Sequence, residues 1–165
     1  MALDTFIAGR YSGAYDSVDV GITRDGFELQ QNNVTEAIDE TDAYGGSLID
    51  FIYRGGNVFI QFTSKAYKAG SITPFWPWAS TLGKMLGSSS PIGRLASAIA
   101  KAMVLSSTAN TPAAASPASL TGSLSILAPN FDGRLMFNSK LREVPIRLQL
   151  LPYESGSDVQ WFLMA

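Results

Sequence analysis

The sequence feature that most constrains the fold is a hydrophobic period of two residues, clearest between positions 143 and 151. Four apolar residues alternate there with polar ones; the apolar positions are Val144, Ile146, Leu148 and Leu150, and Arg147 and Gln149 lie between them. Successive side chains of a β-strand point to opposite faces, so this pattern predicts a strand with one buried face. Pro145 cannot donate a hydrogen bond to a neighbouring strand. The strand is therefore expected either to lie at a sheet edge or to begin at this proline.

The same period appears on both sides of the pair Asp25-Gly26. The apolar positions that keep this period are Val18, Val20, Ile22, Phe27 and Leu29. Glycine accepts the positive φ that a tight turn needs, so residues 17–29 are predicted to form a β-hairpin. A third strand is predicted over residues 34–38, and an acidic loop follows it.

Further strands are expected in the middle and at the end of the chain. Residues 48–53 fit either a short helix or a strand, and Gly55-Gly56 is expected to break the chain before a buried strand at 58–62. Strands are also predicted at 120–128 and at 159–163, because apolar positions alternate in both segments.

One segment has the periodicity of a helix. Its apolar residues recur at intervals of three and four; they are Ile92, Leu95, Ile99, Ala102 and Met103. This spacing predicts one main helix from Pro91 to Leu105. Residues 106–119 consist of Ser, Thr, Ala and Pro with one Asn, a composition typical of a flexible loop.

These patterns together predict a mainly β fold: an antiparallel β-sandwich, or a barrel-like sheet, with one packed α-helix and long loops. A chain of 165 residues can bury a core of its own, so one domain is expected to span residues 1–165.

The chain contains no Cys and no His, which excludes many kinds of chemistry. Thiolate catalysis, disulfides, the usual zinc sites and imidazole acid-base catalysis all need one of these residues. The acidic group Glu36, Asp39, Glu40 and Asp42 lacks the ligand spacing of an EF-hand calcium loop. We therefore expect no enzyme activity, no metal and no cofactor.

Charge is distributed unevenly along the chain. Residues 1–42 contain nine acidic and two basic residues, whereas the rest contains five acidic and ten basic residues. The net charge of −2 does not suggest a protein that binds nucleic acid tightly. The asymmetry instead suits head-to-tail contact between copies of the chain, and a solvated acidic face is the alternative.

Only 16% of the residues are charged, against about a quarter in a typical globular domain. Some of the uncharged surface is therefore expected to face partners. The aromatic residues Trp76 and Trp78 follow Phe75 with no basic cluster beside them, so they are interpreted as core or subunit-interface anchors. Arg10, Arg54, Arg142 and Arg147 lie beside strand or turn segments without clustering, so they are also expected at subunit contacts.

Three segments resemble the tail tube proteins of tailed bacteriophages: residues 21–29, residues 45–62 with Asp50-Phe51-Ile52-Tyr53-Arg54-Gly55, and residues 139–153. The resemblance covers most of the chain and includes no catalytic motif. It implies a virion structural protein that self-assembles into stacked hexameric rings, contacts other tail proteins, and forms a conduit that DNA passes through without specific binding. In such a conduit an acidic wall repels phosphates, so Asp19, Glu28 and Glu36 are candidate lumen residues.

Other functions fit parts of the same pattern. A tail-completion protein, or a capsid-decorating or carbohydrate-binding β-sandwich, is the main alternative, with Tyr44, Trp76 and Trp78 as sugar platforms. A hydrolase that uses carboxylates is a weaker one. The N-terminus lacks the pattern of a secretory signal, and the apolar stretch 92–105 is too short to span a membrane, so synthesis in the host cytoplasm is expected before incorporation into the virion.

Overall fold

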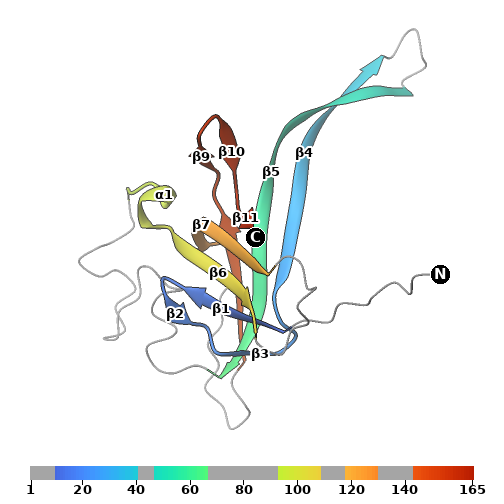
Figure 1. Cartoon of the computed structure of the whole chain (residues 1–165). Helices are drawn as coiled ribbons and strands as arrows, with labels where there is room; N and C mark the ends of the chain where they lie inside the picture. Colours follow the sequence, from blue (N-terminus) through green and yellow to red (C-terminus); the bar gives the residue numbers. More distant parts are fainter. Residues whose placement is uncertain (1–9, 41–46, 67–92, 109–117, 130–142) are drawn as a thin grey trace, which may run out of the picture.

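The computed structural model describes residues 10–40, 47–66, 93–108, 118–129 and 143–165 (Figure 1). The described elements are β1 (Tyr11–Tyr15), β2 (Val18–Asp19), β3 (Ile22–Thr23), β4 (Glu28–Glu40), β5 (Ser47–Ala66), α1 (Ala96–Ile99), β6 (Lys101–Ser107), β7 (Ser119–Leu127), β8 (Val144–Leu150), β9 (Tyr153–Ser155), β10 (Asp158–Gln160) and β11 (Leu163–Met164).

Almost all of these strands belong to one antiparallel sheet. Its order is β2-β1-β6-β7-β8-β5-β3, with β4 paired to β5 and β11 paired to β7, while β9 and β10 form a separate hairpin. The prediction of a mainly β fold with a single helix is confirmed for the described part of the chain.

The sheet curls around one hydrophobic core. The buried residues of this core are Tyr15, Val20, Val58, Ile60, Phe62, Met103, Leu105, Leu120, Leu127, Val144, Ile146, Leu148 and Leu150. Tyr15 is fully buried, and its hydroxyl donates a hydrogen bond to the Ser125 carbonyl at 3.0 Å, which ties β1 to β7. Burial raises the pKa of the Tyr15 phenol, and the nearby Asp16 carboxylate raises it further.

Strand β8 has the alternation that the sequence predicts. Its four apolar residues are buried, and Arg147 and Gln149 point to the other side. Pro145 is the second residue of β8; at this position β8 pairs with β5, whereas pairing with β7 begins only at Leu148. The strand therefore starts near its proline and is not an edge strand, so only the second of the two expectations is correct.

The predicted long helix is wrong for most of its length. Helix α1 covers only Ala96–Ile99, Ala100 is already extended, and β6 occupies Lys101–Ser107. Met103 and Leu105 are buried because β6 lies between β1 and β7, where an extended chain completes the ladder. Strands also occupy both ends of the predicted loop 106–119, since Ser106 pairs with Ser119. Pro91 and residues 109–117 lie outside the described residues.

The predicted hairpin around Asp25-Gly26 does not form. Strands β3 and β4 both pair with β5, and β3 does not pair with β4 within the described sheet. Gly21 and Gly26 have φ angles of 78° and 82°, so the chain turns twice in this segment. The extra turn at Gly21 removes Ile22 from the face of Val20, which explains why Val20 is buried and Ile22 is exposed.

Strands β4 and β5 are longer than the sequence suggests. The second hairpin strand and the third strand are one strand, β4, and residues 48–53 are extended. Gly55-Gly56 does not break the chain, because β5 continues through both glycines. The predicted strand 159–163 is divided between β10 and β11, with Trp161 and Phe162 between them.

Candidate functional site

The most distinctive feature of the structure is a two-stranded arm. We define the arm as residues 34–40 of β4 and 47–55 of β5, and the body as the other described residues. Figure 1 shows the arm leaving the body and bending away from it. On β5, burial ends at the base of the arm: Val58 is buried, whereas residues 48–55 are exposed.

One face of the arm continues the face of the sheet that covers the core. Directly paired residues of antiparallel strands share a face, and Thr35 pairs with Tyr53 while Ala37 pairs with Phe51. The Phe51 and Tyr53 rings meet edge to face at a centroid distance of 5.3 Å. Their residues are 45% and 65% exposed, so the core-side face of the arm is an open aromatic surface.

The opposite face of the arm is mixed in character. Glu36 pairs with Ile52, and Ile38 pairs with Asp50. Ile38 and Ile52 are exposed, and the Glu36 carboxylate forms an ion pair with the Arg54 guanidinium. Large apolar side chains are therefore exposed on both faces of the arm. An apolar surface of this kind is typical of a protein that binds a partner.

The outer edge of β4 is also open. All thirteen residues of β4 pair with β5, and among the described residues no second strand pairs with β4. A long unpaired edge presents backbone donors and acceptors that can pair with a strand of another chain.

Strands β4, β5 and β8 have a polar outer face, opposite to the core. Across the strands, Gln61 donates to Glu28 at 2.7 Å, and Gln149 donates to Asn57 at 3.1 Å. Arg147 donates to Gln30 at 3.3 Å and covers the Phe59 ring at 4.1 Å from its centroid. The outer face is therefore a lattice of amides with one carboxylate and one guanidinium. The sequence interpretation missed this lattice, although the polar positions at 28–32, 57–61 and 147–149 carried the signal.

The structure separates the three candidate lumen acids. Glu28 lies on the outer face, and Glu36 points to the same side of β4 farther along the strand, on the arm. Asp19 lies on β2, at the other end of the sheet order, where its carboxylate accepts a hydrogen bond from the Gly21 backbone at 2.8 Å. Asp19 is thus not brought together with the other two acids.

The candidate interface arginines do not form one patch. Arg54 lies on the arm and Arg147 on the outer face, whereas Arg10 precedes β1 and lines a pocket of the body. Arg142, Trp76, Trp78 and Tyr44 lie outside the described residues.

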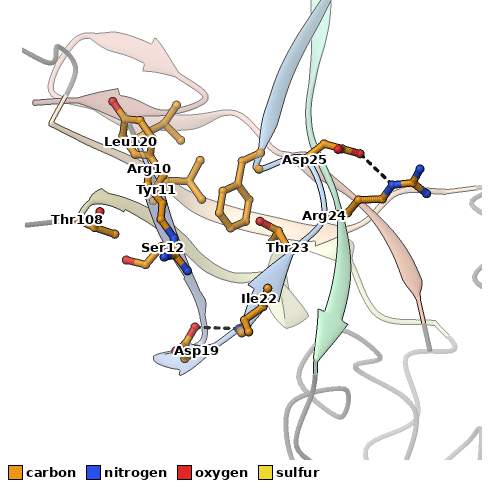
Figure 2. Close-up of a pocket in the computed structure, with 14 residues that line it drawn as sticks. Arg10, Tyr11, Ser12, Asp19, Ile22, Thr23, Arg24, Asp25, Thr108 and Leu120 are labelled. Carbon is orange, nitrogen blue, oxygen red and sulfur yellow. Dashed lines mark hydrogen bonds and ion pairs between the residues drawn. The ribbon is translucent and has the colours of Figure 1, made fainter. Parts of the chain in front are cut away.

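The pocket at Arg10 has a volume of about 780 Å³ and is shown in Figure 2. Its lining combines polar side chains with apolar ones, including Phe27, Leu105 and Leu120. In the close-up, Arg24 pairs with Asp25, and the Asp19 carboxylate accepts a hydrogen bond from the Gly21 backbone. Arg24 also forms an ion pair with Glu143 at 3.2 Å. These contacts hold the turns around Gly21 and Gly26 in place.

Acidic residues do not gather into a metal site in the described segments, where no group of three or more potential ligands was found. No helix in the described part of the chain is long and apolar enough to cross a membrane.

Sequence comparisons identify no relative. No protein-family model matches the chain, and no curated protein matches it.

Solved structures with a similar fold were found. A chain in the tube-terminating cap of an anti-feeding prophage superposes with a TM-score of 0.51 at 13% identity, covering 100% of this chain and 94% of that chain. A chain in the sheath-tube complex of an extracellular contractile injection system, in its extended state, superposes with a TM-score of 0.48 at 9% identity, covering 99% of this chain and 93% of that chain. The first similarity establishes a shared fold.

Proposed function

We propose that this chain is a structural subunit of a phage-tail-like tube, which assembles with copies of itself into stacked hexameric rings around a conduit. The observation that carries the proposal is the arm, whose exposed apolar residues on both faces need a partner. The fold shared with a chain of a tube-terminating cap supports it. The whole chain, residues 1–165, acts in this proposal as one non-enzymatic domain of a virion or a virion-like particle.

Within a ring, we propose that the open edge of β4 pairs with a strand of the neighbouring subunit. Such pairing would satisfy the unpaired backbone groups of β4 and join the sheets of adjacent subunits. The arm would then reach a further copy and bury Phe51 and Tyr53 against it.

The outer face is the wall we propose for the conduit. It is polar, its side chains are bonded to one another, and it includes Glu28. Passing DNA would meet mostly amides, together with one carboxylate and one guanidinium per subunit, and the guanidinium is held by Gln30 and Phe59. Such a wall has no excess positive charge to hold phosphates. Of the candidate lumen acids, the two on β4 fit this wall, and the place of Asp19 on β2 makes it a separate candidate. We propose Arg10, Arg142, Trp76 and Trp78 as contact residues. Arg147, which donates to Gln30 on the outer face, is proposed as a residue of the wall.

The test is assembly of the purified protein. Electron microscopy and sedimentation across a range of concentrations are expected to show rings or tubes. Replacing both Phe51→Ser and Tyr53→Ser is expected to leave a folded monomer, because it removes the aromatic surface without touching the core. Val159→Ser, on an exposed apolar residue of β10, is the matched control and should assemble normally. A wild-type protein that stays monomeric at every concentration would refute the proposal.

A further inference from the structure

We propose that the direction of the arm is set within the subunit, by a β-bulge at Arg54-Gly55 and by the Glu36–Arg54 ion pair across it. Arg54 then acts as a positioning residue for self-association and does not itself contact the neighbouring copy. The consequence for assembly rests on the proposed function, whereas the arm's direction can be measured in a monomer.

The bulge is visible in the register of β4 and β5. Val34 pairs with Gly55 and Thr35 pairs with Tyr53, so Arg54 is an extra residue on β5 with no partner on β4. An extra residue on one strand bends the pair and increases its twist. This is the first register shift beyond the body, and Figure 1 shows the paired strands bending between the body and the tip of the arm.

Gly55 makes this backbone conformation possible. Its φ is +127°, in a region that other residues rarely adopt, and no atom lies within 4 Å of a Cβ placed there. Lack of space is therefore not the reason for glycine at this position. The conformation is the reason, so a larger residue would strain the bulge and redirect the arm.

The ion pair spans the bulge on the mixed face of the arm. The Nε and Nη2 atoms of Arg54 both contact the same Glu36 carboxylate oxygen. Glu36 is on β4 and Arg54 is the bulged residue of β5, so the pair ties the extra residue to the opposite strand. Among the described residues, the Glu36–Arg54 pair is the one ion pair within the arm. The other carboxylate described on β5 of the arm, Asp50, accepts a hydrogen bond from the neighbouring Phe51 backbone at 2.7 Å.

The core-side face at the base of the arm borders a pocket between the two strands and the C-terminal segment. A notch of about 260 Å³ lies there, lined by Gln31, Asn33, Gly55, Gly56, Val58, Gln160, Trp161 and Phe162. The buried indole nitrogen of Trp161 has no hydrogen-bond partner, so this side chain does not tie the C-terminal segment to the arm by a hydrogen bond. Among the described residues, the bulge and the ion pair are the features that we propose set the direction of the arm.

Exchanging the charges of Glu36 and Arg54 distinguishes a positioning role of Arg54 from a direct contact between Arg54 and the neighbouring copy. The single variants Arg54→Glu and Glu36→Arg place like charges across the bulge, and each should raise the concentration needed for half-assembly by at least about tenfold, equivalent to about 1.4 kcal/mol. The double variant restores an ion pair and should restore assembly. If Arg54 contacted a neighbour, the double variant would assemble no better than Arg54→Glu, and that result would overturn the proposal. Lys101→Glu, which breaks the exposed Lys101–Asp16 pair of the body, is the matched control.

A second measurement reports the arm directly. The chain has no native cysteine, so Ala37→Cys on the arm and Ser12→Cys on β1 give two unique spin-label sites. In dilute monomer, the distance between the two spin labels is expected to have one narrow distribution. Arg54→Glu and Gly55→Val should each shift or broaden this distribution. The double variant with exchanged charges should restore it. Unchanged distributions in both variants would refute the positioning role. If wild-type protein never assembles but the distances respond as expected, the tube proposal fails and the role of the bulge stands.

Discussion

Gly13 illustrates how a single residue allows two segments of this fold to approach each other closely. A Cβ atom at this position would lie 2.5 and 2.7 Å from two ring atoms of Phe27, and 3.1 Å from the methyl carbon of Met103. The Phe27 ring is itself packed against Phe62, at a centroid distance of 5.0 Å. The segment that leads into β4 can therefore approach β1 only where β1 has no side chain.

Gly13→Ala is predicted to lower the free energy of unfolding by about 1–3 kcal/mol, because the ring and Met103 must shift within a packed core. Urea denaturation followed by tryptophan fluorescence would measure the change. Ser12→Ala, at the exposed neighbouring position, should have a much smaller effect. Adding Phe27→Leu to Gly13→Ala should recover part of the loss, and equal stabilities of the wild type and Gly13→Ala would contradict the steric explanation.

Tyr15 should make stability depend on pH in the alkaline range. Burial raises the pKa of its phenol above the ordinary value of 10.0, so the folded state favours the neutral form. This contribution is fully present below pH 10 and is lost as the pH rises above that value. The free energies of unfolding of the wild type and Tyr15→Phe should therefore change with pH in the same way below pH 10. Above pH 10, only the wild type should lose the Tyr15 contribution. Parallel curves from pH 9 to 11 would show that Tyr15 does not supply this dependence.

Individual elements show where the sequence was sufficient and where it was not. The alternation at 144–150 identified β8, because the residues between its four apolar positions are polar or proline and only one period fits. Ile99, Ala102 and Met103 fit a helical stripe, but Met103 and Leu105 also fit a period of two, and the space between β1 and β7 selects the strand. Tertiary pairing overrode the local pattern.

The arm could not be predicted from periodicity for a different reason. The bulges between Val34 and Thr35 and between Ile38 and Asp39 change which β5 residues share a face, so apolar residues at 48, 49, 51, 52 and 53 do not alternate. A mixed pattern of this kind fits either a helix or a strand. The candidate residues Glu36 and Arg54 were identified singly, but their pairing depends on the bulge.

Helix α1 is predicted to contribute little to stability. It has four residues, none of them buried, and its N-cap side chain makes no capping hydrogen bond. Ala96→Gly together with Ala98→Gly should therefore change the free energy of unfolding by no more than about 1 kcal/mol, despite the low helix propensity of glycine, because no residue of this turn is buried. Thermal denaturation would test this, and a loss similar to that of a core substitution such as Leu148→Ala would show that α1 packs more tightly than its exposure indicates.

At the scale of the whole molecule, the polar and apolar surfaces are separated. The core lies inside the curled sheet, the aromatic surface lies on the arm, and the amide lattice lies on the outer face of β4, β5 and β8. The surfaces that would bind a copy and the surface that would line the conduit in the proposed assembly can therefore coexist on the same two strands. The charge asymmetry of the sequence did not reveal this separation, because the described acidic residues of the N-terminal third are spread over β2, β4 and the turns that precede these strands.

The proposed conduit wall leads to a prediction about Glu28. Glu28→Lys replaces the carboxylate that Gln61 binds with an ammonium, and in a ring this new positive charge would be repeated around the axis. Assembled tubes of this variant are expected to retain double-stranded DNA, and the retention should weaken as salt rises, because screening reduces attraction to phosphates.

Asp158→Lys, on the exposed hairpin of β9 and β10, makes the same change in charge away from the wall and should not retain DNA. DNA retention by tubes of Asp19→Lys tests separately whether β2 faces the conduit. Glu36→Lys is unsuitable for this experiment because it also breaks the ion pair of the arm. If Glu28→Lys tubes of normal appearance pass DNA as the wild type does, the outer face does not line the conduit, and another face of the subunit must.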